Sequence, residues 1–281
     1  MSFFGVTGYN DIREAVIQAL SDPKVKTILL DVNSGGGQVS GVDDLSGLLK
    51  QASAIKPITT FADGMMASAA YWLGSSGSHI TASQTAIVGS IGVLSKHTEY
   101  SQADAKEGIK TTIVRAGRYK ALANSVEPLS AEARAEIQQQ ANDIYEIFIN
   151  RVADNRGVSS VVADTQMGQG REFLGKRSLA AGLVDEIGTY ESALARAQAM
   201  ASALEGANSL PKDKKGSNMK PKATLTPQQL AAIASGASLD AALESAEAAA
   251  EAALAAAAEE TNEEDEAAEG AADETAEGAE A

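Results

Sequence analysis

The chain has 281 residues and no cysteine, which excludes disulfide scaffolds, thiol catalysis and cysteine-built zinc sites. Its net charge is −15, but residues 241–281 hold 14 of the 38 acidic residues and none of the 23 basic ones, so the rest is nearly neutral. Such a body offers no basic patch for nucleic acid or an anionic membrane. There is no apolar run near the ~18 residues of a membrane span and no signal-peptide pattern, which predicts a cytoplasmic protein.

The first half of the chain alternates predicted helices and strands. A helix is expected over 10–22, with Asn10 as its cap, and a buried strand over 26–34. A helix over about 39–52 and a short strand over 57–61 follow, and another helix starts near Ser68. Short strands are expected near 80–81 and over 85–93. This alternation predicts an α/β fold built from parallel βαβ units.

The second half is mostly helical by its pattern. A helix is expected over 130–157, with Ser130 as its cap and Gly157 as its end. Its apolar stripe comprises Ile137, Ala141, Ile144, Ile147, Phe148 and Val152. A short helix, a strand over 183–187 and a last helix complete a body that ends near Leu204. We therefore divide the chain into a domain (1–205), a Lys- and Pro-rich linker (206–227) and an Ala/Glu-rich acidic tail (228–281), helical at first and disordered at its end.

Two segments could supply the parts of a hydrolytic site. The triglycine at 35–37 follows a predicted strand, where it is either a tight turn or a place where backbone N–H groups reach a ligand oxygen, as in an oxyanion hole. Ser68 is either an ordinary helix cap or a nucleophile in the positive field of a helix start. The small residues around Ser68 would leave room for an approaching peptide carbonyl.

A serine nucleophile also needs a general base. His79 and His97 are the only histidines, and their surroundings in the sequence give neither one a strong case as the base of a Ser-His-Asp triad. A lysine whose amine is kept neutral is the alternative base.

Three blocks occur in order: "ILLDVNSGGGQVSG", "FADGMMASAAYWLGSSGSHITASQTAIVGSIGV" and "IVRAGRYKALANSVEPLSAEARAEIQ". Together they resemble the signal peptide peptidase A family of serine peptidases, which includes phage capsid assembly (head maturation) proteases. The resemblance covers roughly 6–203 and implies a Ser-Lys dyad on a crotonase/Clp-protease-like fold. It also implies assembly into rings or other homo-oligomers, and no metal, nucleotide or other cofactor.

The resemblance also implies a role for individual residues. Its nucleophile falls on Ser68 and its general base on Lys120, in "GRYKALA". Its oxyanion hole falls on the backbone N–H groups of Gly36, Gly37 and Ala69, and a position that orients the lysine falls on Ser90. Two departures stand out: Gly35 replaces a proline that the family usually has, and the chain is short at its N-terminus relative to the family.

The tail favours the phage branch, in which a protease is often fused to a scaffold. The branch implies a prohead protease in the host cytoplasm or procapsid interior, acting on capsid, portal or scaffold proteins. Met219 is a hypothetical internal start for a separate scaffold product. The alternatives are a solubilising tail, a bacterial signal peptide peptidase, an acyl-CoA enzyme that uses the same glycine N–H groups, and a non-catalytic scaffold or assembly protein.

Overall fold

The computed structural model describes residues 7–209, 229, 241–242, 244–245 and 248. Residues 26–204 form one compact unit, and residues 1–25 with 205–281 form a second, so each is described by itself. The predicted tail, almost all of the linker and Met219 lie outside the described residues. Among the residues that are described, there is no helix long and apolar enough to cross a membrane.

Helix α1 (Tyr9–Ser21) belongs to the second unit. It begins one residue before the predicted cap, so the assignment of Asn10 as the N-cap is wrong. Gly8 takes that position, and its N–H donates to the Asp11 carboxylate (3.1 Å). The Asp11 carboxylate accepts a hydrogen bond from the Gly8 N–H, and its negative charge interacts favourably with the positive end of the helix dipole. Both effects stabilise a helix start at this position.

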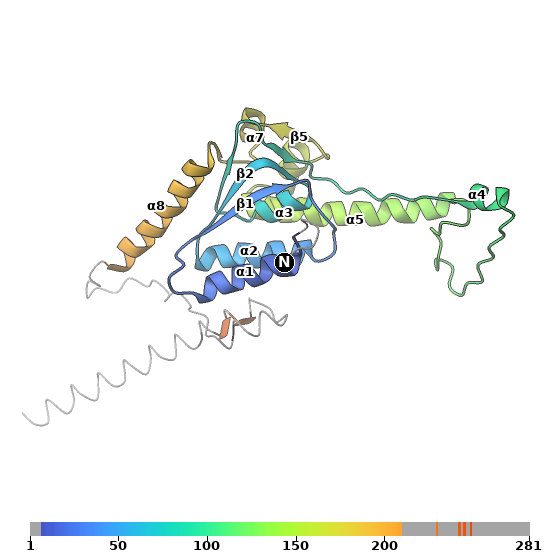
Figure 1. The fold of residues 1–281 in the computed structure, drawn as a ribbon, viewed down its shortest axis with the longest axis horizontal. Helices are drawn as coiled ribbons and strands as arrows, with labels where there is room; N and C mark the ends of the chain where they lie inside the picture. The colour runs from blue at the N-terminus through green and yellow to red at the C-terminus, as the bar shows by residue number, and fades with distance from the viewer. Residues whose placement is uncertain (1–6, 210–228, 230–240, 243, 246–247, 249–281) are drawn as a thin grey trace, which may run out of the picture. The chain divides into compact units, whose positions relative to one another are not determined.

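The larger unit is built on a six-stranded sheet (Figure 1). Its strands are β1 (Ile28–Ser34), β2 (Ile58–Ala67), β3 (His79–Ala82), β4 (Ile87–Gly89), β5 (Glu172–Leu174) and β6 (Glu186–Ile187). The order is β5-β4-β2-β3-β6, and β1 pairs with β2. Every pair is parallel except β4 with β5. The prediction of an α/β fold with parallel strands is thereby confirmed.

Strand β2 changes its neighbour halfway along. Thr59–Ala62 pair with β3, whereas Met65–Ala67 pair with β4. The sequence prediction ended this strand at residue 61, two residues before an Asp63-Gly64 pair of a kind that often marks a turn. The strand instead continues to Ala67, and this continuation brings the carboxyl ends of β1, β2 and β4 together.

Within residues 26–209, eight helical segments accompany the sheet. They are α2 (Val42–Ile55), α3 (Ala69–Gly74), α4 (Ser101–Lys106), α5 (Ala131–Arg156), α6 (Ser160–Val162), the π-helix η1 (Ala163–Met167), α7 (Lys176–Ala180) and α8 (Tyr190–Ser209). The predicted caps of α5 are confirmed: Ser130 accepts a hydrogen bond from the Ala133 N–H (3.0 Å), and Gly157 is left-handed (φ 65°). Helix α2 begins later than predicted, because Gly41 (φ 83°) is its N-cap.

The two ends of α5 have different surroundings. Near its C-terminal end Phe148 and Val152 are buried, and the Phe148 ring stacks on Trp72 of α3, with centroids 4.1 Å apart. Toward its N-terminal end the members of the stripe, Ile137, Ala141 and Ile144, are only partly buried. Figure 1 shows this end of α5 running away from the sheet, with α4 beside it. We call residues 93–141 the arm.

Candidate active site

The site lies where three parallel strands end. Ser34 of β1 is in register with Met66, and Ala67 of β2 is in register with Gly89 of β4. Carboxyl ends of parallel strands are where α/β proteins commonly bind ligands. Ser68 follows β2 directly, and its N–H donates to the Gly89 carbonyl (2.8 Å). The candidate nucleophile therefore stands at the centre of this edge.

Ser68 occupies a strained turn between β2 and α3. Its backbone angles are φ 53° and ψ −126°, in a region that residues other than glycine rarely adopt. Such a conformation costs about 1–3 kcal/mol and persists only where the surroundings enforce it. Here the Trp72 N–H donates to the Ser68 carbonyl (3.0 Å), and α3 begins at the next residue. Sharp strand-to-helix turns of this kind present nucleophilic serines in hydrolases.

Gly36 lies directly against Ser68. Its φ is +117°, and a Cβ placed on it would lie 2.8 Å from the Ser68 Cβ and 3.2 Å from the Ala69 nitrogen. No residue with a side chain fits there without a shift. As the first residue of α3, Ala69 has an N–H that the helix does not use. Gly36 and the start of α3 thus lie beside Ser68, the region in which the sequence predicts oxyanion donors, whereas no contact of Gly37 with Ser68 is found in the described part of the chain.

The Gly36 N–H also has a partner in this structure. It donates to the Ser34 Oγ at 3.2 Å. A substrate oxygen would have to replace this hydroxyl before Gly36 could serve as an oxyanion donor.

Ser90 lies beside Ser68 in a matching position. It follows Gly89, which pairs with Ala67, and its φ is also positive (51°). Its N–H donates to the Arg171 carbonyl (2.7 Å). The sequence analysis did not single out Gly89 or Arg171. Gly89 has φ +116°, and an added Cβ would lie 2.8 Å from the Arg171 oxygen, so this glycine is required for β4 to end beside Ser68.

The structure does not bring Lys120 to Ser68. Lys120 lies in the exposed segment between α4 and α5, and its N–H donates to the Gly117 carbonyl (3.1 Å). Figure 1 shows this segment at the end of α5 that is remote from the sheet. The other end of α5 meets α3 through Phe148, and at about 1.5 Å per residue Phe148 and Ala131 are roughly 25 Å apart. A single copy therefore holds the two members of the predicted dyad apart.

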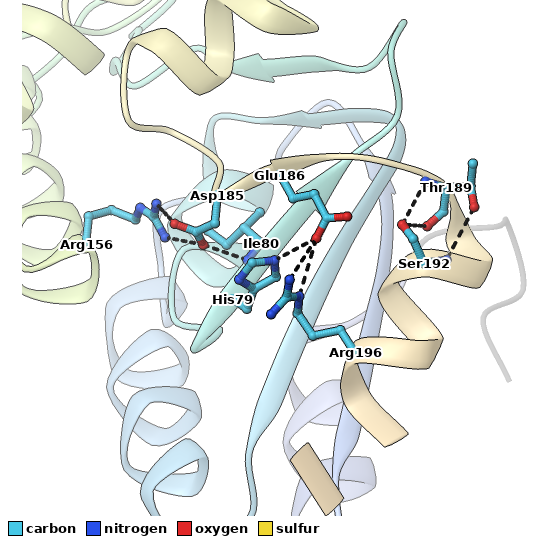
Figure 2. Close-up of polar contacts among 8 residues, drawn as sticks. All are labelled: His79, Ile80, Arg156, Asp185, Glu186, Thr189, Ser192 and Arg196. Carbon is cyan, nitrogen blue, oxygen red and sulfur yellow. Dashed lines mark hydrogen bonds and ion pairs between the residues drawn. The ribbon is translucent and has the colours of Figure 1, made fainter. Parts of the chain in front are cut away.

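Neither histidine supplies a base to Ser68 in this structure. His79 on β3 pairs with Glu186 (3.2 Å), which also accepts from Arg196, as Figure 2 shows. His97 lies on the arm, where its Nε2 is buried and has no partner within the described part of the chain. It lines a hollow of mixed character, with Leu129 and Ile137 as well as Arg134 and Gln138. The described residues include no hydrogen bond from either ring to Ser68.

A second polar cluster in Figure 2 joins α5 to β3 and to the loop before β6. The Arg156 guanidinium donates to both Asp185 oxygens (2.6 and 3.1 Å), and Asp185 also accepts from the Ile80 N–H (2.8 Å). Partial burial works to raise the pKa of Asp185, but the hydrogen bonds and charge of Arg156 outweigh it, so the pKa is lowered. The same bonds raise the pKa of Arg156 against the opposing effect of burial. This ion pair therefore links α5 to the residue that precedes β6, and through the Ile80 N–H to β3.

The part of the chain that the structure describes contains no set of side chains that could ligate a metal ion. No group of three or more His, Asp or Glu side chains gathers there in a way that could hold a metal ion.

A family profile and individual relatives both identify this chain as similar to known peptidases. The sequence profile of peptidase family S49 matches residues 50–204, more than half of the chain. Capsid assembly protease C of Escherichia phage lambda is 35% identical over 66% of this chain, and the head-tail preconnector protein GP5 of Enterobacteria phage P21 is 34% identical over 66%. Protease 4 of Salmonella typhi is 32% identical over 70%. The matched regions span 42%, 36% and 31% of these three relatives, so the chain covers less than half of each.

Proposed function

This chain belongs to peptidase family S49, and from that premise we propose that it is a serine endopeptidase with Ser68 as nucleophile and Lys120 as general base. The observation that carries the proposal is the strained turn at Ser68, packed against Gly36 and followed by the free helix start at Ala69. A serine that only capped a helix would need neither the left-handed backbone nor a glycine pressed against it.

The reaction would be a two-step acyl transfer. The neutral amine of Lys120 takes the Ser68 hydroxyl proton, and Oγ attacks the peptide carbonyl. The oxyanion is bound by N–H groups of Gly36, Gly37 and Ala69, the C–N bond breaks, and the lysine returns the proton to the leaving amine. Water, deprotonated by the same lysine, then releases the acyl group and restores Ser68. Ser90, which follows Gly89 beside Ser68, would hydrogen-bond the incoming lysine amine.

We propose further that Lys120 comes from a second copy of the chain. Within one copy the arm keeps Lys120 away from Ser68, and the arm exposes apolar side chains that a neighbour could cover. Leu94 is 89% exposed and Val114 is 95% exposed. Exposed apolar groups concentrated on one projecting segment mark an interaction surface. A homo-oligomer in which each arm reaches the next copy would complete every site.

For the biological role, we propose a prohead protease that acts on capsid, portal or scaffold proteins within the assembling particle in the host cytoplasm. The support is the names of two similar phage proteins, a capsid assembly protease and a head-tail preconnector protein. The acidic Ala-rich tail fits a scaffold portion that the same protease removes.

The test uses the purified full chain and its Ser68→Ala and Lys120→Ala variants, followed by intact mass and by cleavage of a quenched fluorescent peptide. Wild type should cleave, and each variant alone should not. If Lys120 acts across copies, mixing the two inactive variants should restore part of the activity, because some interfaces combine an intact serine with an intact lysine. Activity that persists in Ser68→Ala would overturn the proposal. Inactive mixtures that still form mixed oligomers would overturn the delivery of Lys120 by a second copy.

A further inference from the structure

A buried polar cluster lies behind the Ser68 turn. Ser46 of α2 and Ser75 and Ser76 at the end of α3 are fully buried, and Asn155 near the end of α5 is 6% exposed. The Asn155 amide nitrogen lies 3.1, 2.9 and 3.2 Å from the hydroxyls of Ser46, Ser75 and Ser76. Four polar side chains therefore meet where three helices pack, and Asn155 is their common partner.

The protons of the three hydroxyls are already used. Ser46 and Ser75 each lie within reach of the Trp72 carbonyl (3.0 and 2.9 Å), and Ser76 lies within reach of the Ser46 carbonyl (3.1 Å). The Ser46 and Ser76 hydroxyls are also 2.9 Å apart, and either one can donate to the other, so each proton has a partner other than Asn155. The hydroxyls therefore present only lone pairs to residue 155, which must be a donor. This fixes the orientation of the amide, with its nitrogen toward the serines. Its oxygen is buried without a partner in the described part of the chain, so the cluster keeps an acceptor at some cost.

This cluster connects to Ser68 through one residue of α3, Trp72. The Trp72 carbonyl accepts both serine hydroxyls, while the Trp72 N–H donates to the Ser68 carbonyl. Helix α3 has only six residues, too few to be stable by itself. The strained conformation of Ser68 thus depends on how firmly α3 is held from outside.

We propose that Asn155 is a positioning residue that holds α3, through Ser46, Ser75 and Ser76, in the place where the Ser68 turn is enforced. Asn155 is distinct from the site residues and from the lysine-orienting serine, and its role in turnover rests on the proposed function. Its role in holding the turn does not, which allows the two to be tested separately.

The first experiment follows amide hydrogen exchange in peptides that cover residues 66–74. Asn155→Asp keeps the shape of the side chain but has no proton to donate when ionised, and Ser75→Ala is a milder change if the first variant folds poorly. The control is Ser178→Ala, which removes an equally buried hydroxyl that donates to the Gly175 carbonyl (2.6 Å) in α7. We expect exchange in 66–74 to be about tenfold faster in the Asn155 and Ser75 variants and unchanged in the control. Exchange in the Asn155 and Ser75 variants that is no faster than in wild type would overturn the proposal.

The second experiment measures peptide cleavage by the same variants well below their unfolding temperatures. A displaced Ser68 should lower kcat by about ten- to a hundredfold with KM nearly unchanged, because small misplacements of reacting groups are costly. Ser178→Ala should retain wild-type kcat. If wild type is inactive while exchange changes as expected, the proposed function fails and the positioning role stands. If exchange changes but kcat does not, Asn155 holds α3 without serving turnover, and that part of the proposal is overturned.

Discussion

The corner of the sheet around Ser68 and the arm that carries Lys120 are built in opposite ways. Around Ser68 the backbone is enforced from several sides, by Gly36, by the Gly89 carbonyl and by the Trp72 N–H. On the arm, side chains such as Leu94 and Val114 are left in solvent. Under the proposed function, the nucleophile Ser68 is preorganised within one copy, whereas the base Lys120 lies on a segment that a second copy would have to cover.

The largest effect that would sharpen this contrast is at Lys120. Lys120→Ala should lower cleavage by about a thousandfold or more, because it removes the proposed general base. It should leave the unfolding transition unchanged, because the side chain is exposed. Lys110→Ala, at another exposed lysine of the same segment, is the control and should behave as wild type in both assays. A similar loss of activity in both variants would mean that the charge of the arm, and not a particular amine, is what matters.

The next prediction compares neighbouring residues of α5. Phe148→Ala should reduce the free energy of unfolding by about 3–5 kcal/mol, because it leaves a cavity against Trp72. Ile147→Ala should change it by less than about 0.5 kcal/mol when measured on the dissociated chain, since that side chain is half exposed. Denaturant unfolding monitored by the single tryptophan checks both. Equal effects would contradict the assignment of these two side chains to a packed face and an exposed face of α5.

A third prediction concerns two adjacent glycines. Gly36→Ala should lower kcat by about a hundred- to a thousandfold, because the new Cβ would collide with Ser68 and disturb the oxyanion donors. Gly35→Ala should stay within a few-fold of wild type, because its Cβ would make only an ordinary contact with the Met65 sulfur (3.4 Å). Steady-state kinetics on the fluorescent peptide distinguish them. A tolerant Gly36 would contradict the close packing at the corner.

The smallest effect is expected at the ion pair between Arg156 of α5 and Asp185, which also accepts from the Ile80 N–H of β3. The folded-state pKa of Asp185 is lowered, so its stabilising contribution is complete above the unfolded-state pKa and is lost as pH falls through the folded-state pKa. Asp185→Asn should therefore be less stable than wild type by about 1–3 kcal/mol at neutral pH, and the difference should shrink in acid. Thermal unfolding as a function of pH measures this. A difference that stayed constant into acid would contradict the assignment of the effect to ionised Asp185.

What the sequence could predict depended on how local each feature is. The caps of α5 at Ser130 and Gly157 are local chemistry, and both were found where expected. The position of Ser68 at a helix start was also correct, whereas its left-handed backbone was not foreseen, because Gly36 and Gly89 enforce it from distant segments. The placement of Lys120 depends on where a long helix leads, which periodicity does not encode. The extent of β2 was missed because its partner changes at a pair of residues that usually ends a strand.

Helix α8 restricts where one copy of the chain could cut another. It runs without a break from Tyr190 to Ser209, past Leu204, where the body was expected to end. A peptidase binds its substrate as an extended chain, so a bond inside a helix must be unwound before it can be cut. We expect self-trimming to spare the bonds between Tyr190 and Ser209, so that the mature chain keeps this helix beyond Leu204. The mass of the trimmed product would show directly whether this helix is kept.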